Sequence, residues 1–258
     1  MRIFVVGGGG FVGSAYIRLF DRLRIQCASI NRANYAEHVG RSCDVLINAN
    51  GNSRKYLAVR DPKTEFDATV RTVVHTLEDF RAGTYVFLST GDVYANQERP
   101  QITREELAPD PRRMSRYGLH KFIAEFFVKA LHPEWLIMRM GGFVGPGLRK
   151  NAIFDMLNDK PVWLDLNSEL QFISTDRAAE IVWTLVNKGI RNDTVNLAAK
   201  GVMRLGDIYQ RLGSKSTLDL VAKKVRFEIS TEKLERLYGK ELPKTADEVG
   251  AFLKSLNR

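Results

Sequence analysis

The sequence has few cysteines and no long apolar run, and both absences narrow the class of protein. Its 258 residues include only two cysteines, Cys27 and Cys43. Two isolated cysteines in a chain of this length indicate reduced, buried thiols rather than a disulfide framework. No stretch reaches the roughly 18 consecutive apolar residues of a membrane span. The apolar run 3–6 meets glycines too soon to form the core of a signal peptide. We therefore expect a cytoplasmic protein with no membrane partner.

Low-complexity tracts, internal repeats and metal-ligand clusters are also absent from the sequence. The four histidines (His38, His75, His120 and His132) fall on separate predicted elements without ligand spacing, so no metal site is expected. Hydrophobic residues make up 44% of the chain and charged residues 27%. This balance is typical of one globular domain, or of one domain with a small appendage.

Acidic residues are fewer than basic ones, 30 against 39, which gives a formal net charge of +9. An excess of positive charge favours anionic partners, among them phosphorylated cofactors and substrates. The basic residues are spread along the chain and are not interleaved with aromatic residues as in an RNA-binding sheet. We expect a phosphate-bearing small molecule as partner and no nucleic acid.

Short apolar runs alternate with longer amphipathic segments in the first half of the chain. The apolar runs predict strands at 2–6, 25–30, 44–48, 85–89 and 135–139. The amphipathic segments predict helices at 11–23, 63–80 and 115–131. Such alternation indicates βαβ units, in which a right-handed crossover joins neighbouring parallel strands. The first half therefore predicts an α/β domain with a parallel sheet.

The pattern changes after residue 141. The segment 141–147, GGFVGPG, is rich in Gly and Pro and is predicted to be a loop. Helices are predicted at 151–158, 175–188, 203–212 and 231–256, the last of them interrupted by Pro243. Thr245 and Glu248 have the spacing of a capping box for the final helix. We expect a nucleotide-binding domain at 1–141 and a smaller, mixed α/β, substrate-binding part at 142–258, interleaved with the first.

A glycine-rich turn lies between the first predicted strand and the first predicted helix. It reads GGGGFVG from Gly7 to Gly13, and both possible motif registers use Gly10 and Gly13. Glycine there permits a tight turn and lets the backbone approach a pyrophosphate, whose charge the helix N-terminus favours. With a strand before it and a helix after it, the turn predicts a doubly wound, Rossmann-type domain that binds a dinucleotide. The residues expected at the pyrophosphate are Gly7, Gly10, Phe11, Val12 and Gly13.

The end of the second predicted strand favours one dinucleotide over the other. An acidic residue there binds the ribose 2′-hydroxyl of NAD, whereas an arginine accommodates the 2′-phosphate of NADP. This chain has Asn31 and Arg32, and its next acidic residue is Glu37. The sequence therefore favours NADP over NAD, with Asn31 and Arg32 beside the cofactor. A solvated Arg32 would leave the preference open.

Tyr117 and Lys121 are four residues apart on a predicted helix and so lie on one face. A phenol has a pKa of about 10, and a neighbouring cation favours its ionised form. Tyr117 is therefore a candidate acid/base that exchanges a proton with a substrate alcohol. His120 points about 100° around the helix from Lys121 and is interpreted as a bystander. By itself the spacing also suits an amphipathic helix with a surface lysine.

Together these motifs resemble the extended short-chain dehydrogenase/reductases, in particular the NAD-dependent epimerase/dehydratase group that acts on nucleotide sugars. The resemblance spans nearly the whole chain. Besides the glycine turn and YGLHK at 117–121, it rests on DVLINA at 44–49, FLSTGDVY at 87–94, Arg139 with GPG at 145–147, FISTD at 172–176 and the closing segment 230–243.

The resemblance implies an NAD(P)-dependent enzyme and assigns roles to its residues. Thr90 stands at the position of the family's catalytic Ser or Thr and would hydrogen-bond the reacting oxygen, with Tyr117 as acid/base and Lys121 on the nicotinamide ribose. Asn48, Ala49 and Asn50 would line the adenosine and pyrophosphate, and Leu88 and Ser89 would pass beneath the nicotinamide. Arg139 would be structural. A homodimer through the helix that bears Tyr117 is also expected.

Departures from the family pattern narrow the reaction. Sugar-nucleotide 4,6-dehydratases have an acidic pair after the catalytic threonine, which here is Gly91 and the shorter Asp92. Gly142 replaces a frequent asparagine, and the arginine that grips the substrate diphosphate is missing near Leu170. The substrate-side residues expected here are Asp92, Gly142, Arg149 and Lys150. The last two either hold phosphates or are solvated loop charges.

The expected function is hydride transfer at C4 of a nucleotide-linked or otherwise phosphorylated sugar, by a reductase or an epimerase. Freely exchanging NADP(H) favours reduction, and tightly held NAD favours epimerisation. Two alternatives stay open: a 4,6-dehydratase, and a non-catalytic NAD(P)-binding member with a redox-sensing or RNA-binding role. The complete set of Thr90, Tyr117 and Lys121 argues against the non-catalytic alternative.

Overall fold

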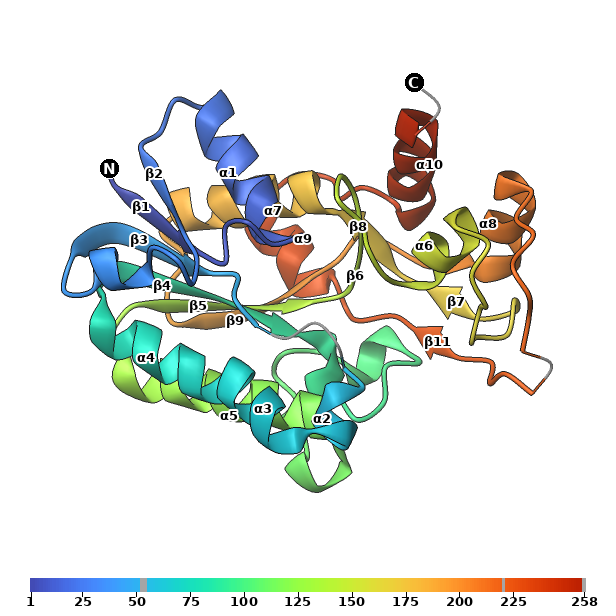
Figure 1. Ribbon diagram of the computed structural model, residues 1–258, viewed down its shortest axis with the longest axis horizontal. Helices are drawn as coiled ribbons and strands as arrows, with labels where there is room; N and C mark the ends of the chain where they lie inside the picture. The colour runs from blue at the N-terminus through green and yellow to red at the C-terminus, as the bar shows by residue number, and fades with distance from the viewer. Residues whose placement is uncertain (52–54, 220, 257–258) are drawn as a thin grey trace.

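Six parallel strands form the main sheet of the computed structural model, which describes residues 1–51, 55–219 and 221–256 (Figure 1). The strand order is β2-β1-β3-β4-β5-β9. The bounds are β1 Ile3–Val6, β2 Cys27–Ile30, β3 Ser42–Asn48, β4 Arg81–Thr90, β5 Trp135–Met140 and β9 Asp193–Leu197. Every neighbouring pair is parallel. The predicted class, a doubly wound parallel α/β sheet with a smaller C-terminal part, is confirmed.

Helices cover both faces of this sheet (Figure 1). Successive side chains of a strand point to opposite faces, so Ile3 and Val5 pack in one apolar cluster while Phe4 and Val6 pack in another. The first cluster includes residues of α1 (Gly13–Arg22), α7 (Thr175–Asn187) and α9 (Glu232–Tyr238). The second includes residues of α4 (Thr72–Asp79) and α5 (Arg116–Leu131). Burial on both faces explains why the strands are continuous apolar runs.

The connections between the strands differ in part from the expectation. The predicted helix 63–80 consists of α3 (Pro62–Phe66), a π-helical turn η2 (Asp67–Arg71) and α4, preceded by the short α2 (Leu57–Arg60). The crossover from β2 to β3 contains only the 3-10 turn η1 (Tyr35–His38). Cys27 is half-buried on β2 and Cys43 is buried on β3, both as free thiols. None of the helices described is long and apolar enough to cross a membrane.

The smaller C-terminal part has two short sheets around its own apolar cluster. In one, β6 (Gly142–Val144) pairs with β8 (Phe172–Ser174); in the other, β7 (Glu169–Leu170) lies between β10 (Met203–Arg204) and β11 (Arg226–Phe227). Its helices are α6 (Ala152–Leu157), α8 (Leu205–Leu212) and α10 (Thr245–Leu256). α7 and β9 also come from 142–258, so this stretch of the sequence contributes to both parts.

Two sequence-based predictions for this part are wrong. The segment 141–147 is not simply a loop, because β6 begins at Gly142. A Cβ at Gly142 would lie 2.6 Å from the Gln171 carbonyl oxygen, so glycine here permits close strand pairing instead of breaking the strand. The helix predicted at 203–212 begins only at Leu205, because Met203 and Arg204 pair with β7.

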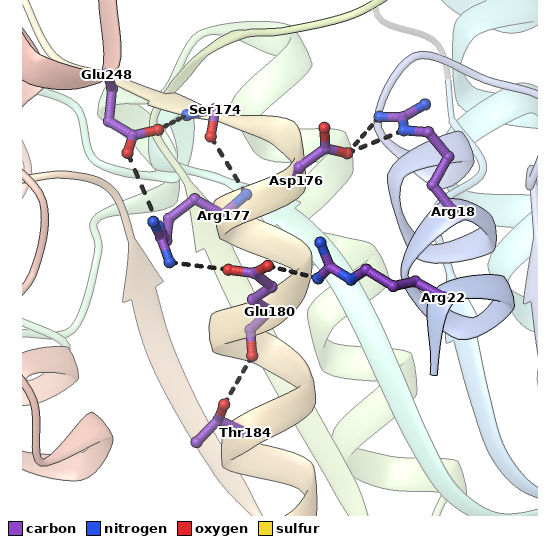
Figure 2. Close-up of polar contacts among 8 residues, drawn as sticks. All are labelled: Arg18, Arg22, Ser174, Asp176, Arg177, Glu180, Thr184 and Glu248. Atoms are coloured by element: carbon purple, nitrogen blue, oxygen red, sulfur yellow. Dashed lines mark hydrogen bonds and ion pairs between the residues drawn. The ribbon is translucent and has the colours of Figure 1, made fainter. Parts of the chain in front are cut away.

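The predicted capping box at Thr245 and Glu248 is also wrong. The Thr245 hydroxyl donates to the Gly201 carbonyl oxygen at 2.6 Å and accepts from the Phe172 backbone N–H at 3.3 Å. The Glu248 carboxylate accepts from the Ser174 backbone N–H at 2.7 Å (Figure 2). Both side chains therefore attach α10 to β8 instead of satisfying their own helix end.

Ion pairs attach α1 to α7 along one face of the sheet (Figure 2). Arg18 pairs with Asp176 at 2.5 Å, and Arg22 pairs with Glu180 at 2.6 Å. Pairs this exposed contribute little stability, on the order of 0–1 kcal/mol each. Their role is orientation, because they join the helix that follows the glycine turn to a helix from the C-terminal half.

Candidate active site

The glycine turn lies where the strand order of the sheet reverses. β1 has β2 on one side and β3 on the other, and ligands of doubly wound sheets bind beyond the carboxyl ends of the strands at such a point. The two loops that leave these strand ends touch, because a Cβ at Gly7 would lie 2.9 Å from the Asn50 backbone nitrogen. The predicted residues Gly7, Ala49 and Asn50 are thus brought together.

The turn has the shape that a pyrophosphate requires. Gly7 has a φ of +81°, and its carbonyl oxygen accepts from the Gly10 N–H at 2.9 Å. A Cβ at Gly13 would lie 2.2 Å from the Gly7 carbonyl oxygen, whereas a Cβ at Gly9 would meet no described heavy atom within 4 Å. The absence of a side chain at Gly13 therefore allows α1 to pack closely on the turn, and the space beside Gly9 is open.

At the N-terminus of α1 the N–H groups of Ser14 and Ala15 donate to the carbonyl oxygens of Gly10 and Val12 at 2.9 and 3.2 Å. The N-cap residue of α1 is Val12, whose side chain makes no capping hydrogen bond. Among the residues that the structure describes, the first turn of this helix contains no acidic residue. The positive end of the helix dipole favours a phosphate at this position. Phe11 and Val12 complete the connection from Gly10 to the helix. These residues fit the pyrophosphate of a dinucleotide.

The end of β2 is a turn held by asparagines. The Asn34 side chain accepts from the Asn31 N–H at 2.8 Å and donates to the Ser29 carbonyl oxygen at 3.0 Å. Asn31 also accepts from the Ala33 N–H at 2.8 Å. The hydrogen bonds of Asn31 and Asn34 thus fix the backbone of this turn. Arg32, on the same turn, is exposed to solvent.

Asn48 shapes the loop after β3 from beneath. Its side chain is fully buried and donates to the hydroxyls of Thr76 at 3.0 Å and Tyr85 at 2.7 Å. Its carbonyl oxygen accepts from the Asn50 backbone N–H at 3.0 Å. Asn48 therefore anchors the loop to the core, and Ala49 and Asn50 are only half-buried beside the glycine turn.

The predicted reacting groups come from β4 and α5. Thr90 ends β4, and Tyr117 and Lys121 lie on α5, whose N-cap Ser115 accepts from the Gly118 N–H at 3.1 Å. A Cβ at Gly118 would lie 2.0 Å from the Asp92 carbonyl oxygen. This close approach packs α5 on η3 (Gly91–Val93), the turn that follows Thr90, and so brings Tyr117 within the electrostatic reach of Asp92.

Lys121 links α5 to β4 and to the loop after β3. Its Nζ donates to the Leu88 carbonyl oxygen at 3.0 Å and lies 4.7 Å from the centre of the Phe87 ring. It also lies 3.2 Å from the position of a Cβ at Gly51, in the loop after β3. Burial lowers the pKa of Lys121 to about 8, although the carboxylates of Glu65 and Glu125 oppose the shift. The side chain is therefore still an ammonium at neutral pH.

Tyr117 is held as a neutral phenol. Its side chain is nearly buried, and burial raises its pKa well above the ordinary value. The negative charges of Asp92 and Glu65 raise the pKa further. A neutral phenol is suited to donate a proton.

Two buried carboxylates behind the site were not predicted from the sequence. Glu65 of α3 is fully buried and contacts the Nδ1 atom of His120 and the hydroxyl of Thr69. His120 is thus a partner of α3 and not simply a bystander on α5. No sequence pattern indicates this pair, since its members are 55 residues apart.

Glu125 is the second buried carboxylate, and it accepts from the Ser89 hydroxyl at 2.5 Å and from Arg139 at 2.8 Å. A signal for it exists, because it follows Lys121 by four residues on the same helix face. Ser89, which donates this hydrogen bond, is also fully buried. Arg139 is buried in an ion pair, as suits a structural residue.

The predicted substrate-side residues lie in two places. Asp92 belongs to the Thr90 and Tyr117 group. Gly142 is in β6, where close pairing with Gln171 accounts for the glycine. Arg149 and Lys150 are exposed in the loop before α6, in the C-terminal part. Within the described residues, no hydrogen bond or ion pair joins Arg149 to Thr90, Asp92 or Tyr117, so these predictions rest on the sequence.

A parallel sheet with a glycine turn at its switch point, and a threonine, tyrosine and lysine at the neighbouring strand end, defines a dinucleotide-binding α/β protein. A comparison with protein families identifies the family within this class. Residues 3–198 match the model of the NAD dependent epimerase/dehydratase family. The chain belongs to this family.

Known relatives are distant but cover most of the chain. GDP-6-deoxy-D-talose 4-dehydrogenase of Aggregatibacter actinomycetemcomitans is 24% identical over 239 residues, 82% of this chain and 79% of the relative. A crystal structure of UDP-galactose 4-epimerase is 22% identical, with a TM-score of 0.79 over 96% of this chain and 95% of that chain. RMD from Pseudomonas aeruginosa, complexed with NADPH, is 18% identical, with a TM-score of 0.80 over 98% of each chain. At such identities the structures establish the fold alone.

Proposed function

We propose that this protein is an NADP(H)-preferring reductase that acts on the 4-keto group of a nucleotide-linked sugar. The observation that carries the proposal is Tyr117, held neutral by burial and by two carboxylates, on α5 where this helix packs on the turn that follows Thr90. A neutral phenol at this point suits proton donation to a carbonyl oxygen. The relatives support the substrate class, since their names refer to the 4-position of GDP- and UDP-linked sugars.

The chemistry follows from the arrangement of the three side chains. The Thr90 hydroxyl, whose proton Asp92 holds, accepts a hydrogen bond from the alcohol that reduction forms. The bound cofactor supplies the hydride that the carbonyl carbon receives. Tyr117 donates its phenolic proton to the oxygen, so a secondary alcohol forms and a phenolate is left. Lys121, an ammonium at neutral pH, stabilises this phenolate until solvent returns the proton.

The residues that would hold the cofactor follow the strand ends. Gly7, Gly10, Phe11, Val12 and Gly13 would hold the pyrophosphate, and Asn31 and Arg32 the adenosine ribose with its 2′-phosphate. Ala49 and Asn50 would line the adenosine side, with Asn48 supporting them, and Leu88 and Ser89 would support the nicotinamide. Lys121 would also reach the nicotinamide ribose.

Arg149 and Lys150 are the proposed ligands of the substrate phosphates, and Gly142 is proposed to lie beside the substrate. A 4,6-dehydratase is not proposed, because the carboxylate it would need, Asp92, is engaged with Thr90 at 2.9 Å and Lys55 at 2.5 Å. We also propose a homodimer through α5, where Phe126 leaves 66% of its surface exposed and Leu131 leaves 52%. Exposed apolar side chains on one helix suit such an interface.

The first experiment identifies the cofactor. Purified protein is denatured, the released nucleotide is characterised by mass and absorbance, and the emptied protein is titrated with NADPH and NADH. An empty site with NADPH preferred at least tenfold, about 1.4 kcal/mol, supports the reductase. Retained NAD would indicate an epimerase with an internal redox cycle and would contradict the role of Arg32. Binding of neither nucleotide would refute the proposal.

The second experiment tests the substrate class. NADPH oxidation is followed with 4-keto sugars linked to GDP, UDP or dTDP, and with the same sugars lacking the nucleotide. Turnover only with a nucleotide-linked ketone supports the proposal, and turnover of the free sugar alone would contradict the substrate class.

A further inference from the structure

Lys55 contributes a charge to the active site from the segment between β3 and α2. Its Nζ forms an ion pair with Oδ2 of Asp92 at 2.5 Å. The same atom lies 6.0 Å from the ring centre of Tyr117 and 5.5 Å from that of Phe227, on β11. The Lys55 side chain is 58% exposed and the Asp92 side chain only 13%. A largely exposed lysine therefore places its charge on a nearly buried carboxylate.

Asp92 in turn determines how the Thr90 hydroxyl is oriented. The hydroxyl donates its proton to Oδ2 of Asp92 at 2.9 Å, and the Asp92 backbone N–H donates to the hydroxyl oxygen at 3.2 Å. A hydroxyl has one proton and two lone pairs. One lone pair is thus left, which can accept from the hydroxyl group that reduction forms.

The charges around Tyr117 come from four elements. Asp92 approaches it from η3 and Glu65 from α3, and both disfavour a phenolate there. Each carboxylate has its own basic partner, Lys55 for Asp92 and His120 for Glu65. Lys121 lies one turn along α5 from Tyr117 itself. Within the described residues Asp92 forms an ion pair with Lys55, and this contact offsets the negative charge that Asp92 presents to Tyr117.

We propose that Lys55 and Asp92 form a positioning pair for the reacting groups: the Asp92 carboxylate holds the proton of Thr90, and the Lys55 ammonium cancels the charge of that carboxylate beside the Tyr117 phenol. The inference rests on the proposed function, because it concerns the phenolate that proton donation leaves behind. It assigns to Lys55 a role at the site without contact with the substrate.

The experiment measures the ionisation of Tyr117 in the complex with oxidised cofactor. The ultraviolet absorbance of tyrosinate is followed against pH for each protein and for the same protein with Tyr117→Phe, which isolates one of the eight tyrosines. The variants are Lys55→Met, Asp92→Asn and the double variant, with Lys55→Gln as a second neutral form. Lys254→Met removes an equal charge from the exposed face of α10 and is the matched control.

The two single variants are expected to move the titration in opposite directions. Lys55→Met leaves Asp92 uncompensated and raises the midpoint by about one pH unit, and Asp92→Asn lowers it by about one. The double variant returns close to the unsubstituted protein, and Lys254→Met does not move it. A purely structural role would not produce opposite signs.

Two results separate the inference from the function on which it rests. Equal shifts, or no shift, in Lys55→Met and Asp92→Asn would overturn the positioning pair while leaving the reductase intact. Full turnover by Tyr117→Phe would overturn the proposed function itself. A rise in KM for the sugar nucleotide with an unmoved Tyr117 titration would make Lys55 a substrate ligand and would also refute the pair.

Discussion

The carboxylate of Glu125 and the guanidinium of Arg139 form a buried bidentate ion pair. Nε of Arg139 donates to Oε1 of Glu125 at 3.1 Å and Nη2 donates to Oε2 at 2.8 Å, with 3% and 1% of the two side chains exposed. Arg139 also donates to the Tyr94 hydroxyl at 3.1 Å, and the charge of Glu125 raises the pKa of Arg139 above its ordinary value. The pair joins α5 to β5, directly behind the end of β4.

Removing one member of this pair is expected to destabilise the protein strongly. Arg139→Met leaves the Glu125 carboxylate buried without its cation, which costs about 3–5 kcal/mol. The measurement is the free energy of unfolding in urea. Arg112→Met is the control, because Arg112 pairs with Asp110 while 89% of its own side chain is exposed, and the expected change is within about 0.5 kcal/mol. Equal losses in both variants would contradict this account.

Tyr117→Phe is expected to abolish most of the turnover while leaving cofactor binding intact. The proton donor is lost, which lowers kcat by about 100-fold or more, and the ring still fills its place. Steady-state kinetics and calorimetric titration of NADPH measure the two quantities. Tyr209→Phe, in the C-terminal part, should change neither. A drop in NADPH affinity that matches the drop in kcat would argue for a binding role.

Two glycines of the turn are expected to respond differently to alanine. A Cβ at Gly13 would lie 2.2 Å from a backbone oxygen, so Gly13→Ala displaces α1 and lowers the free energy of unfolding by about 1–3 kcal/mol. Gly9→Ala meets no described atom within 4 Å and leaves stability nearly unchanged. Because the open side of Gly9 is the proposed pyrophosphate position, NADPH affinity falls in both variants. Unchanged affinity in Gly9→Ala would place the pyrophosphate elsewhere.

Because of Lys121, the free energy of unfolding of the protein is expected to rise with pH. Its folded-state pKa of about 8 is below its ordinary value of 10.5. Between these values the unfolded chain binds one proton more at this side chain than the folded chain does. The free energy of unfolding therefore rises by up to about 1.4 kcal/mol per pH unit in this window. Urea unfolding at pH values from about 7 to 10 should show the rise, and Lys121→Met should remove it. Parallel curves for the two proteins would disprove it.

Arg32→Ala tests the cofactor preference. If the guanidinium binds the 2′-phosphate, NADPH affinity falls at least tenfold, about 1.4 kcal/mol, while NADH affinity stays the same. Arg41→Ala, another exposed arginine, is the control. An equal loss of affinity for both nucleotides would show that Arg32 does not bind the 2′-phosphate.

The order of the elements and the glycine turn could be predicted because both are local properties of the chain. A buried parallel strand must be apolar on both faces, as Ile3–Val6 is, and a turn of glycines between a strand and a helix has few other uses. Tyr117 and Lys121 were found for the same reason, since four residues on a helix fix a common face. The predictions failed where a glycine or a threonine serves a distant contact, as Gly142 does with Gln171 and Thr245 with Gly201.

The sequence by itself determined the doubly wound α/β sheet and the family, and it predicted the set of Thr90, Tyr117 and Lys121, because periodicity, turn chemistry and short spacings act over a few residues. Only the tertiary structure decided which charges surround that set. Lys55 meets Asp92, Glu65 meets His120 and Glu125 meets Arg139 across separate elements. Such pairs follow from the packing of elements that are distant in the sequence, and no interval along the chain specifies them.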